Sequence, residues 1–146
     1  MKAILYALFV GLLMVGCGED TIDLDDKETL DKIIAEAIDE DKLQGRGKNG
    51  EELYYAPNQQ MPYSGWAKSM QDNGQMMALV QYNDGKWDGP STWWYGNGQK
   101  ASEETYKNGK IVTAVAWLPN GEKCPYTNIV DGNGVLVFYE EDGIEG

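Results

Sequence analysis

Short runs of alternating apolar and polar residues, each ending in Asn-Gly or Asp-Gly, fill the second half of the chain. These turn signals recur at steps of 24, 23 and 22 residues, at Asn73-Gly74, Asn97-Gly98, Asn120-Gly121 and Asp142-Gly143. A second set falls between them, at Asp84-Gly85, Asn108-Gly109 and Asp131-Gly132. Such dipeptides favour tight hairpin turns whose two central residues both need positive φ. A fixed period of this length predicts a mainly β fold, an antiparallel β-meander of tandem hairpin repeats.

The repeats predict which residues share a face of the sheet. They run over about 65–88, 89–111, 112–133 and 134–146, inside a domain that we expect at 52–146. Three residues before each turn stands a large apolar residue (Met70, Trp94, Trp117, Tyr139), whereas the preceding position varies (Ser69, Trp93, Ala116, Phe138). Successive strand residues point to opposite faces. We therefore expect Trp94 in the core and Trp93 on the opposite, more polar face.

A helical pattern precedes the repeats. Apolar residues recur at helical spacing over residues 30–38 (Leu30, Ile33, Ile34, Ala37, Ile38), which is typical of an amphipathic helix. Asp25 or Asp26 can cap its start and Gly45 its end, so we expect the helix at 25–45. Packing of its apolar stripe on the sheet is the favoured interpretation, and binding of a partner is the alternative. Residues 44–51 are expected to form a loop, and Leu53–Tyr55 a strand.

The first residues of the chain predict export. A positive start, an apolar run from Ala3 to Val15 and a small residue before Cys17 have the order of a bacterial lipoprotein signal. The alternative is a plain signal peptide or an uncleaved anchor. We expect a signal peptide at 1–16, acylation of Cys17 (palmitate among the chains), and an acidic tether at 17–24. This predicts a lipoprotein held to a membrane of the cell envelope, inner or outer.

One repeat carries a family resemblance. Residues 89–100 (Gly-Pro-Ser-Thr-Trp-Trp-Tyr-Gly-Asn-Gly-Gln-Lys) and 104–110 (Glu-Thr-Tyr-Lys-Asn-Gly-Lys) resemble a MORN-variant repeat. They are similar to the repeats of bacterial proteins described as the YwqK-type antitoxin component of a toxin–antitoxin system. The third copy departs from this pattern, with Val112 in place of glycine. The resemblance covers about residues 65–143 and implies a hairpin array that serves as a binding or scaffold surface, with no catalytic residues to carry over.

Composition excludes several chemistries. The chain has no histidine, which removes Ser-His-Asp and Cys-His catalysis and the usual ligands of catalytic zinc. Glu103 and Glu104 are adjacent on a predicted strand and point to opposite faces, so they do not form a catalytic pair. Its formal net charge of −12 opposes nucleic-acid binding. Hairpin turns account for the Asp, Asn and Gly residues without calcium. We expect no enzyme activity, no cofactor and no metal.

Function is then expected at a binding surface. The first hypothesis is a lipid-anchored envelope scaffold that binds an unidentified protein partner. The alternatives are an antitoxin-like or immunity protein that neutralises a toxin in the envelope, and a surface glycan-binding module. Trp66, Trp87 and Trp93 are the candidate ligand-facing aromatics, because the other copies do not keep an aromatic at those positions.

Overall fold

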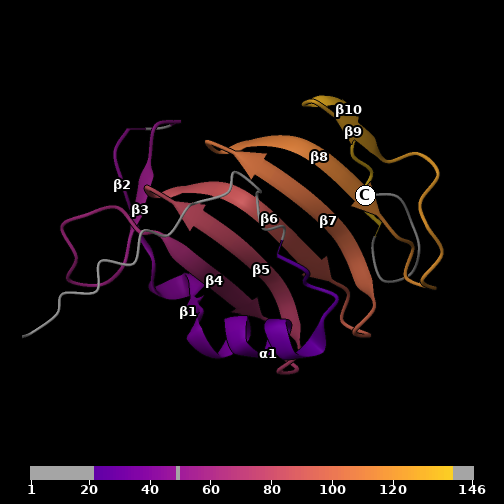
Figure 1. Cartoon of the computed structure of the whole chain (residues 1–146), viewed down its shortest axis with the longest axis horizontal. Helices are drawn as coiled ribbons and strands as arrows, with labels where there is room; N and C mark the ends of the chain where they lie inside the picture. Colours follow the sequence, from indigo (N-terminus) through magenta and orange to yellow (C-terminus); the bar gives the residue numbers. More distant parts are fainter. Residues whose placement is uncertain (1–21, 49, 140–146) are drawn as a thin grey trace, which may run out of the picture.

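The computed structural model describes residues 22–48 and 50–139, in which the expected mainly β fold is confirmed. Eight strands form one sheet in the order β1-β4-β5-β6-β7-β8-β9-β10, in which β1 is the short strand Ile38–Asp39 (Figure 1). From β4 to β10 every neighbouring pair is antiparallel and consecutive along the chain, which makes this part a meander. Its strands are β4 (Gly65–Met70), β5 (Met76–Asn83), β6 (Lys86–Trp94), β7 (Lys100–Lys107), β8 (Lys110–Ala116), β9 (Asn128–Val130) and β10 (Asn133–Val135).

The two sets of turns differ in type. Asp84, Asn108 and Asp131 have φ between 48° and 51° and each precedes a positive-φ glycine, as expected for two-residue hairpin turns. In the other set only the glycines (Gly74, Gly98 and Gly121) have positive φ, so the expectation for Asn73, Asn97 and Asn120 was wrong. The backbone bonds Gly98 N–H to Tyr95 O and Tyr95 N–H to Gln99 O close a three-residue loop, whose glycine alone takes the left-handed conformation. Asp142 and Gly143 lie outside the described residues.

Hydrogen bonds from turn residues join neighbouring repeats. At the three-residue loops, the side-chain amide of Asn73 donates to Gly96 O at 3.4 Å and that of Asn97 donates to Pro119 O at 3.0 Å. At the opposite ends of the strands, the glycines of the two-residue turns also donate backbone bonds. Gly85 donates to Tyr63 O, just before the first repeat, and Gly109 to Trp87 O of the preceding repeat, whereas Gly132 donates to Val112 O at the start of its own repeat. We call these two series the turn ladders. They hold neighbouring repeats in register at both ends of the strands.

The helix is shorter than expected. Helix α1 spans Lys27–Glu36, and the Asp26 carboxylate accepts the Thr29 N–H at its start, as predicted for an N-cap. It ends at Ala37 rather than at Gly45, because the next residues, Ile38–Asp39 (β1), pair in parallel with β4. Sheet pairing therefore overrides the helical spacing of Ile38. Helix α1 packs on the sheet, where Ile34 O accepts the Lys68 ammonium at 2.9 Å (Figure 1).

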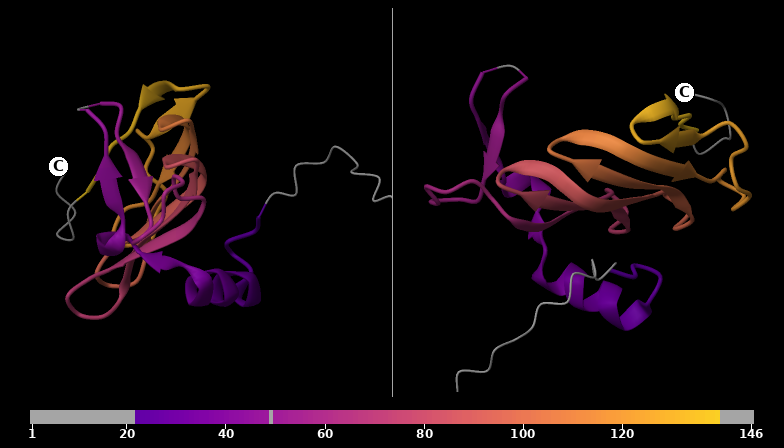
Figure 2. Two further views of the ribbon diagram at one scale, coloured as in Figure 1. Left: turned by 90° about the vertical axis from the view of Figure 1, so that its left-hand side faces the viewer. Right: turned by 45° about the horizontal axis from the view of Figure 1, so that its top comes forward.

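Residues 44–51 also contain more structure than expected. After a short 3-10 helix η1 (Glu40–Lys42), β2 (Gln44–Arg46) pairs antiparallel with the predicted strand β3 (Leu53–Tyr55). This hairpin rises from the edge of the main sheet (Figure 2). Backbone bonds from Tyr54 N–H to Gly85 O and from Tyr63 N–H to Tyr54 O fasten it there. The β structure therefore begins before residue 52, where we expected the domain to start.

The register assigns residues to two faces. On one, which we call the helix face because α1 covers part of it, cross-strand neighbours are Lys68, Leu79, Thr92, Glu103 and Val115. On the other, the aromatic face, one row is Ser69, Ala78, Trp93, Ser102 and Ala116, and the next is Ala67, Val80, Ser91, Glu104 and Ala114. Glu103 and Glu104 thus point to opposite faces, as the alternation predicts.

The expected positions of the two neighbouring tryptophans are reversed. Trp93 packs against the main core cluster of Ala67, Ala78, Val80 and Tyr82, together with Trp87. Trp94 lies on the helix face beside Leu30 and Ile34 of α1 and is half-buried. Met70, another expected core residue, is 47% exposed. Side chains are buried on both faces of the sheet. A large residue at a repeated position therefore does not by itself show which face forms the core.

Candidate functional site

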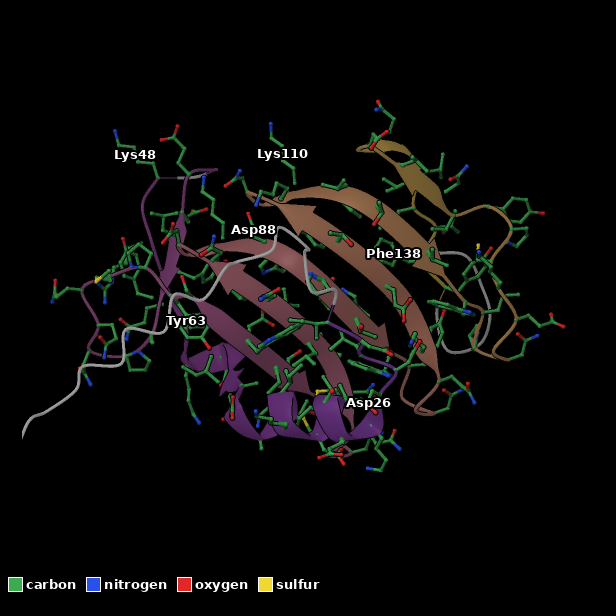
Figure 3. All side chains as sticks on the ribbon, in the orientation of Figure 1. Asp26, Lys48, Tyr63, Asp88, Lys110 and Phe138 are labelled. Carbon is green, nitrogen blue, oxygen red and sulfur yellow. The ribbon has the colours of Figure 1, made fainter. Side chains whose placement is uncertain are left out.

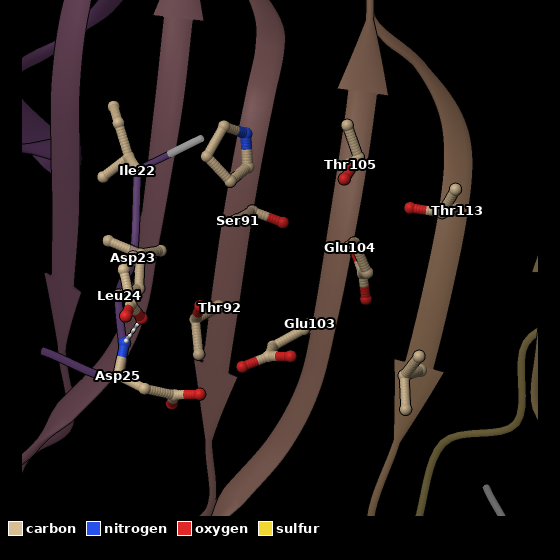
Figure 4. Close-up of a pocket in the computed structure, with 12 residues that line it drawn as sticks. Ile22, Asp23, Leu24, Asp25, Ser91, Thr92, Glu103, Glu104, Thr105 and Thr113 are labelled. Carbon is tan, nitrogen blue, oxygen red and sulfur yellow. Dashed lines mark hydrogen bonds between the residues drawn. The ribbon is translucent and has the colours of Figure 1, made fainter. Parts of the chain in front are cut away.

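The segment before α1 lies across the helix face. Ile22, Asp23, Leu24 and Asp25 line a cavity of about 290 Å³ with residues of β6, β7 and β8 (Figure 4). Lys100 fixes this segment, because its ammonium bonds the Asp25 carboxylate at 2.6 Å and also the Glu103 carboxylate. Burial alone would lower the pKa of Lys100, but its hydrogen bonds with the two carboxylates outweigh burial and raise it. This part of the helix face is therefore already occupied by the chain itself.

A buried carboxylate lies on the aromatic face. Glu104 is only 4% exposed, and it accepts hydrogen bonds from the Ser102 hydroxyl at 2.8 Å and the Tyr106 hydroxyl at 2.7 Å. Burial raises the pKa of Tyr106, and the hydrogen bond to Glu104 raises it further. Both donors are neutral and come from the same strand, β7. Both hydrogen bonds to the buried carboxylate thus come from hydroxyl groups and neither from a second carboxylate, so the arrangement has the character of a structural network.

The first open cavity lies beside the three-residue loops. It has a volume of about 770 Å³ and we call it the tip groove; its lining is Met70, Gln71, Asp72, Asn73, Met77, Trp94, Tyr95, Gly96 and Tyr139. Met70 and Met77 are 47% and 39% exposed. Methionine and aromatic side chains are enriched at the centres of protein interfaces. Asp72 is the one acid in this lining, so the groove lacks the paired carboxylates of acid–base chemistry.

The second open cavity lies at the opposite ends of the strands, beside the two-residue turns. This hairpin cleft, of about 400 Å³, is lined by residues of η1, of the β2–β3 hairpin and of the turns at 84–85 and 108–109. Its aromatic residues are Tyr54, Tyr82 and Trp87; its charged and polar residues are Glu40, Glu52, Lys86, Asn108 and Lys110; Gly50, Gly85 and Gly109 complete it. Figure 3 shows Lys110 at this edge of the sheet, near Asp88.

Aromatic contacts fix the walls of the hairpin cleft. Tyr54 meets Tyr82 edge-on with ring centroids 5.8 Å apart, and Trp87 meets Tyr106 edge-on at 4.9 Å. The Tyr82 hydroxyl donates to Glu40 Oε1 at 3.0 Å. Burial raises the pKa of Tyr82, and the negative charge of Glu40 adds to that rise. Tyr82 therefore stays protonated at neutral pH and holds Glu40 in place by a charge-assisted hydrogen bond.

Asp88 supports the same edge from outside the cleft. Its carboxylate accepts the Asn108 N–H at 3.0 Å and the Lys107 ammonium at 3.0 Å. The backbone hydrogen bond from Asn108, followed by the interaction with Lys107, outweighs the effect of burial and lowers the pKa of Asp88. In the preceding repeat the Ser64 hydroxyl takes this role and accepts the Asp84 N–H at 2.9 Å. These side chains position the two turns that border the hairpin cleft.

The three candidate ligand-facing tryptophans do not share one surface. Trp87 lines the hairpin cleft and also packs against the main core. Trp93 packs against that core on the aromatic face, whereas Trp66, paired with Gln81, lies on the helix face. Cys17, the predicted lipidation site, lies outside the described residues.

Several residues of the two open cavities were missed in the sequence. Tyr54 and Glu52 belong to the hairpin before the repeats, and Glu40 to η1, so no repeat period connects them with Trp87. Only contacts between distant segments bring them together. Met77 was overlooked for a different reason. It occupies a register irregularity, since Ser69 pairs with Ala78 and Met70 with Met76. Such a bulge leaves one residue without a cross-strand partner.

The described residues contain neither a cluster of metal ligands nor a helix that could span a membrane. Nowhere in residues 22–48 and 50–139 do three Cys, Asp or Glu side chains gather as a metal site would require. Within the same ranges no helix has the length and apolar character needed to cross a membrane. Comparison of the chain with known protein families, with curated proteins and with solved structures found no match.

Proposed function

We propose that this chain is a non-catalytic scaffold of the bacterial cell envelope, which is anchored by lipid on Cys17 and binds a protein partner through the tip groove. The exposure of Met70 and Met77 in an open cavity of about 770 Å³ carries this proposal. Exposed apolar patches rimmed by polar residues are typical of protein interaction sites. Here the polar rim is supplied by the loop residues Gln71, Asp72 and Asn73.

The anchor restricts where such a partner can be. Four residues separate Cys17 from Ile22, the first described residue, which lies over the helix face (Figure 4). Fully extended, the five Cα–Cα steps from Cys17 to Ile22 span at most about 18 Å. A lipid on Cys17 would therefore hold the sheet close to the membrane surface. The expected partner is another protein of the same membrane surface or one that approaches it closely.

Site-specific cross-linking tests the groove. A photoreactive benzoylphenylalanine placed at Met77 should form one discrete adduct in intact cells, while the same residue at Tyr126 should not. Tyr126 is the control because it is 67% exposed and does not line the groove. Substitution of Met70 by Asp in the Met77 cross-linking variant should abolish the adduct. Absence of any adduct, or the same adduct from both positions, would show that the tip groove is not the binding surface.

Cell fractionation tests the anchor separately. Cys17→Ser should move the protein from the membrane fraction to soluble or unprocessed forms, because its acyl chains supply the membrane affinity. Undiminished membrane association of Cys17→Ser would disprove lipid anchoring. It would leave the cross-linking result at the groove unaffected, so the two halves of the proposal can fail independently.

A further inference from the structure

The hairpin cleft combines exposed aromatic surface with polar groups of both signs. Tyr54 is 39% exposed, and its ring orientation is fixed by the edge-on contact with Tyr82. Its backbone N–H is bonded to Gly85 O at 2.9 Å, which ties the strand to the neighbouring turn. The aromatic wall is thus held in place before any ligand arrives. Preorganisation of this kind reduces the entropy cost of binding.

The charges around the cleft indicate the class of ligand. Two carboxylates, Glu40 and Glu52, are matched by two ammonium groups, Lys86 and Lys110. This local balance contrasts with a net charge of −12 for the chain. A ligand with a net charge of either sign would be attracted by one pair and repelled by the other, and so would gain no net attraction. The cleft therefore favours a neutral ligand that needs many hydrogen-bond donors and acceptors.

We propose that the hairpin cleft binds a neutral saccharide. The apolar C–H face of a pyranose ring stacks on Tyr54 and on the edge of Trp87, while the sugar hydroxyls bond to Glu52, Lys86 and Asn108. Aromatic side chains offer an apolar surface at low entropy cost, which suits a sugar with one apolar face. A volume of about 400 Å³ falls within the usual range of small-ligand pockets. The hairpin cleft and the tip groove lie at opposite ends of the strands, and the saccharide proposal does not depend on binding at the tip groove.

Titration of the full chain with defined sugars tests the proposal. The protein is purified from membranes in a detergent without a sugar head group, and is titrated with maltotriose, cellotriose, mannotriose and tri-N-acetylchitotriose. Calorimetry and tryptophan fluorescence provide the readouts, because Trp87 lines the cleft. At least one trisaccharide should bind with saturation and a Kd of about 0.1–1 mM, an affinity expected for a shallow site.

Three variants locate the binding. Tyr54→Ala should weaken binding by at least about tenfold, equivalent to ~1.4 kcal/mol. Glu52→Gln, at an exposed position, should weaken it by a smaller factor without loss of fold. Tyr126→Ala is the matched control, since it removes an exposed tyrosine outside the cleft, and it should bind normally. Circular dichroism checks that each variant is folded.

The proposal fails if none of the four sugars binds at concentrations up to about 10 mM. It also fails if binding persists unchanged in both Tyr54→Ala and Glu52→Gln, because the sugar would then occupy another surface. Glycine betaine, which carries one positive and one negative charge, is included as a zwitterionic probe. Binding of glycine betaine without binding of any trisaccharide would assign the cleft to a zwitterion instead and would overturn the saccharide assignment.

Discussion

The side-chain amide of Asn97 donates to the backbone carbonyl of Pro119 at 3.0 Å, so the loop of one repeat is bonded directly to the loop of the next. The same side chain accepts the Gln99 N–H through Oδ1 at 2.8 Å. Asn97→Asp keeps the acceptor and removes the donor. It should lower the free energy of unfolding by about 0.5–1.5 kcal/mol, the usual net value of one hydrogen bond.

Urea denaturation in high salt, which screens the added charge, measures this loss. Asn73→Asp is the graded comparison, because the equivalent bond from Asn73 to Gly96 O is longer, at 3.4 Å. The smaller effect is therefore expected at Asn73. Equal stabilities of wild type and Asn97→Asp would mean that the loop-to-loop bonds do not contribute to folding.

Truncation of the two neighbouring tryptophans should distinguish the faces. Trp93 packs against the main core cluster, and Trp93→Ala should cost about 3 kcal/mol or more by leaving a cavity there. Trp94 is half-buried like Trp93, but it borders the open tip groove and lies outside that cluster, so Trp94→Ala should lower the free energy of unfolding by less. Chemical denaturation of both variants decides the point. A larger loss in Trp94→Ala would contradict the assignment of the core to the aromatic face.

Two glycines in equivalent turns should respond differently to alanine. Gly85 and Gly109 both have φ of 77°, so the backbone strain of a side chain is the same at each, about 1 kcal/mol. A Cβ at Gly85 would lie 2.9 Å from Tyr54 N and 3.0 Å from the side chain of Pro62, whereas none of the described atoms lies within 4 Å at Gly109. Gly85→Ala should therefore be the more destabilising change in thermal melts.

The comparison also reports on the β2–β3 hairpin. Because the clash at Gly85 involves Tyr54 backbone, it should loosen the hairpin, and hydrogen exchange at the Tyr54 amide should quicken in Gly85→Ala. In Gly109→Ala that amide should keep its wild-type exchange rate. Similar melting temperatures and exchange rates in the two variants would argue against the packing of the hairpin on this turn.

The buried Glu104 should be more sensitive to loss of its donors than to loss of its charge. Tyr106→Phe removes one of the two hydroxyls that bond the carboxylate and should cost about 1–3 kcal/mol. Glu104→Gln keeps an oxygen acceptor for Ser102 or Tyr106 and should cost less than Glu104→Ala, which leaves both hydroxyls unpaired. Urea midpoints should follow this order. An Ala variant as stable as the Gln variant would show that the network is dispensable.

Asp88 should make stability depend on acidity. Its pKa is lowered in the folded state, chiefly by the Asn108 N–H. Such a group stabilises the fold above its unfolded pKa, about 3.9, and the contribution is lost as the pH falls through the lower folded pKa. The stability difference between wild type and Asp88→Asn should thus be full at neutral pH and shrink below about pH 4. A difference independent of pH would rule out this role of the charge.

The sequence predicts the meander well because turn chemistry is local. Asp84-Gly85 and its equivalents specify their own backbone conformation, and the period specifies how often it recurs. The helix end was less predictable, since Ile38 fits the helical stripe and only its pairing with Ala67 draws it into a strand. A parallel pairing between such distant segments leaves no trace in a local pattern.

The face of Trp93 could not be predicted for a different reason. Its cross-strand neighbours on the aromatic face are small, among them Ala78 and Ser102. A single large ring surrounded by small side chains can fill a core as well as a row of side chains of similar size. The residue at this position varies between repeats, which suggested an exposed surface. In the structure that variation lets the large ring of Trp93 pack among smaller neighbours. The hairpin cleft shares this difficulty, because Tyr54 and Trp87 come from segments with no common pattern.

The turn ladders have a consequence for how this protein can change over generations. Each described repeat is joined to its neighbour by bonds that use the backbone and one recurrent asparagine, as from Asn97 to Pro119. A duplicated or deleted unit would find the same partners at both of its edges. Gene duplication within the array could therefore lengthen or shorten the sheet without new side-chain chemistry, while the two cavities at its edges diverge independently.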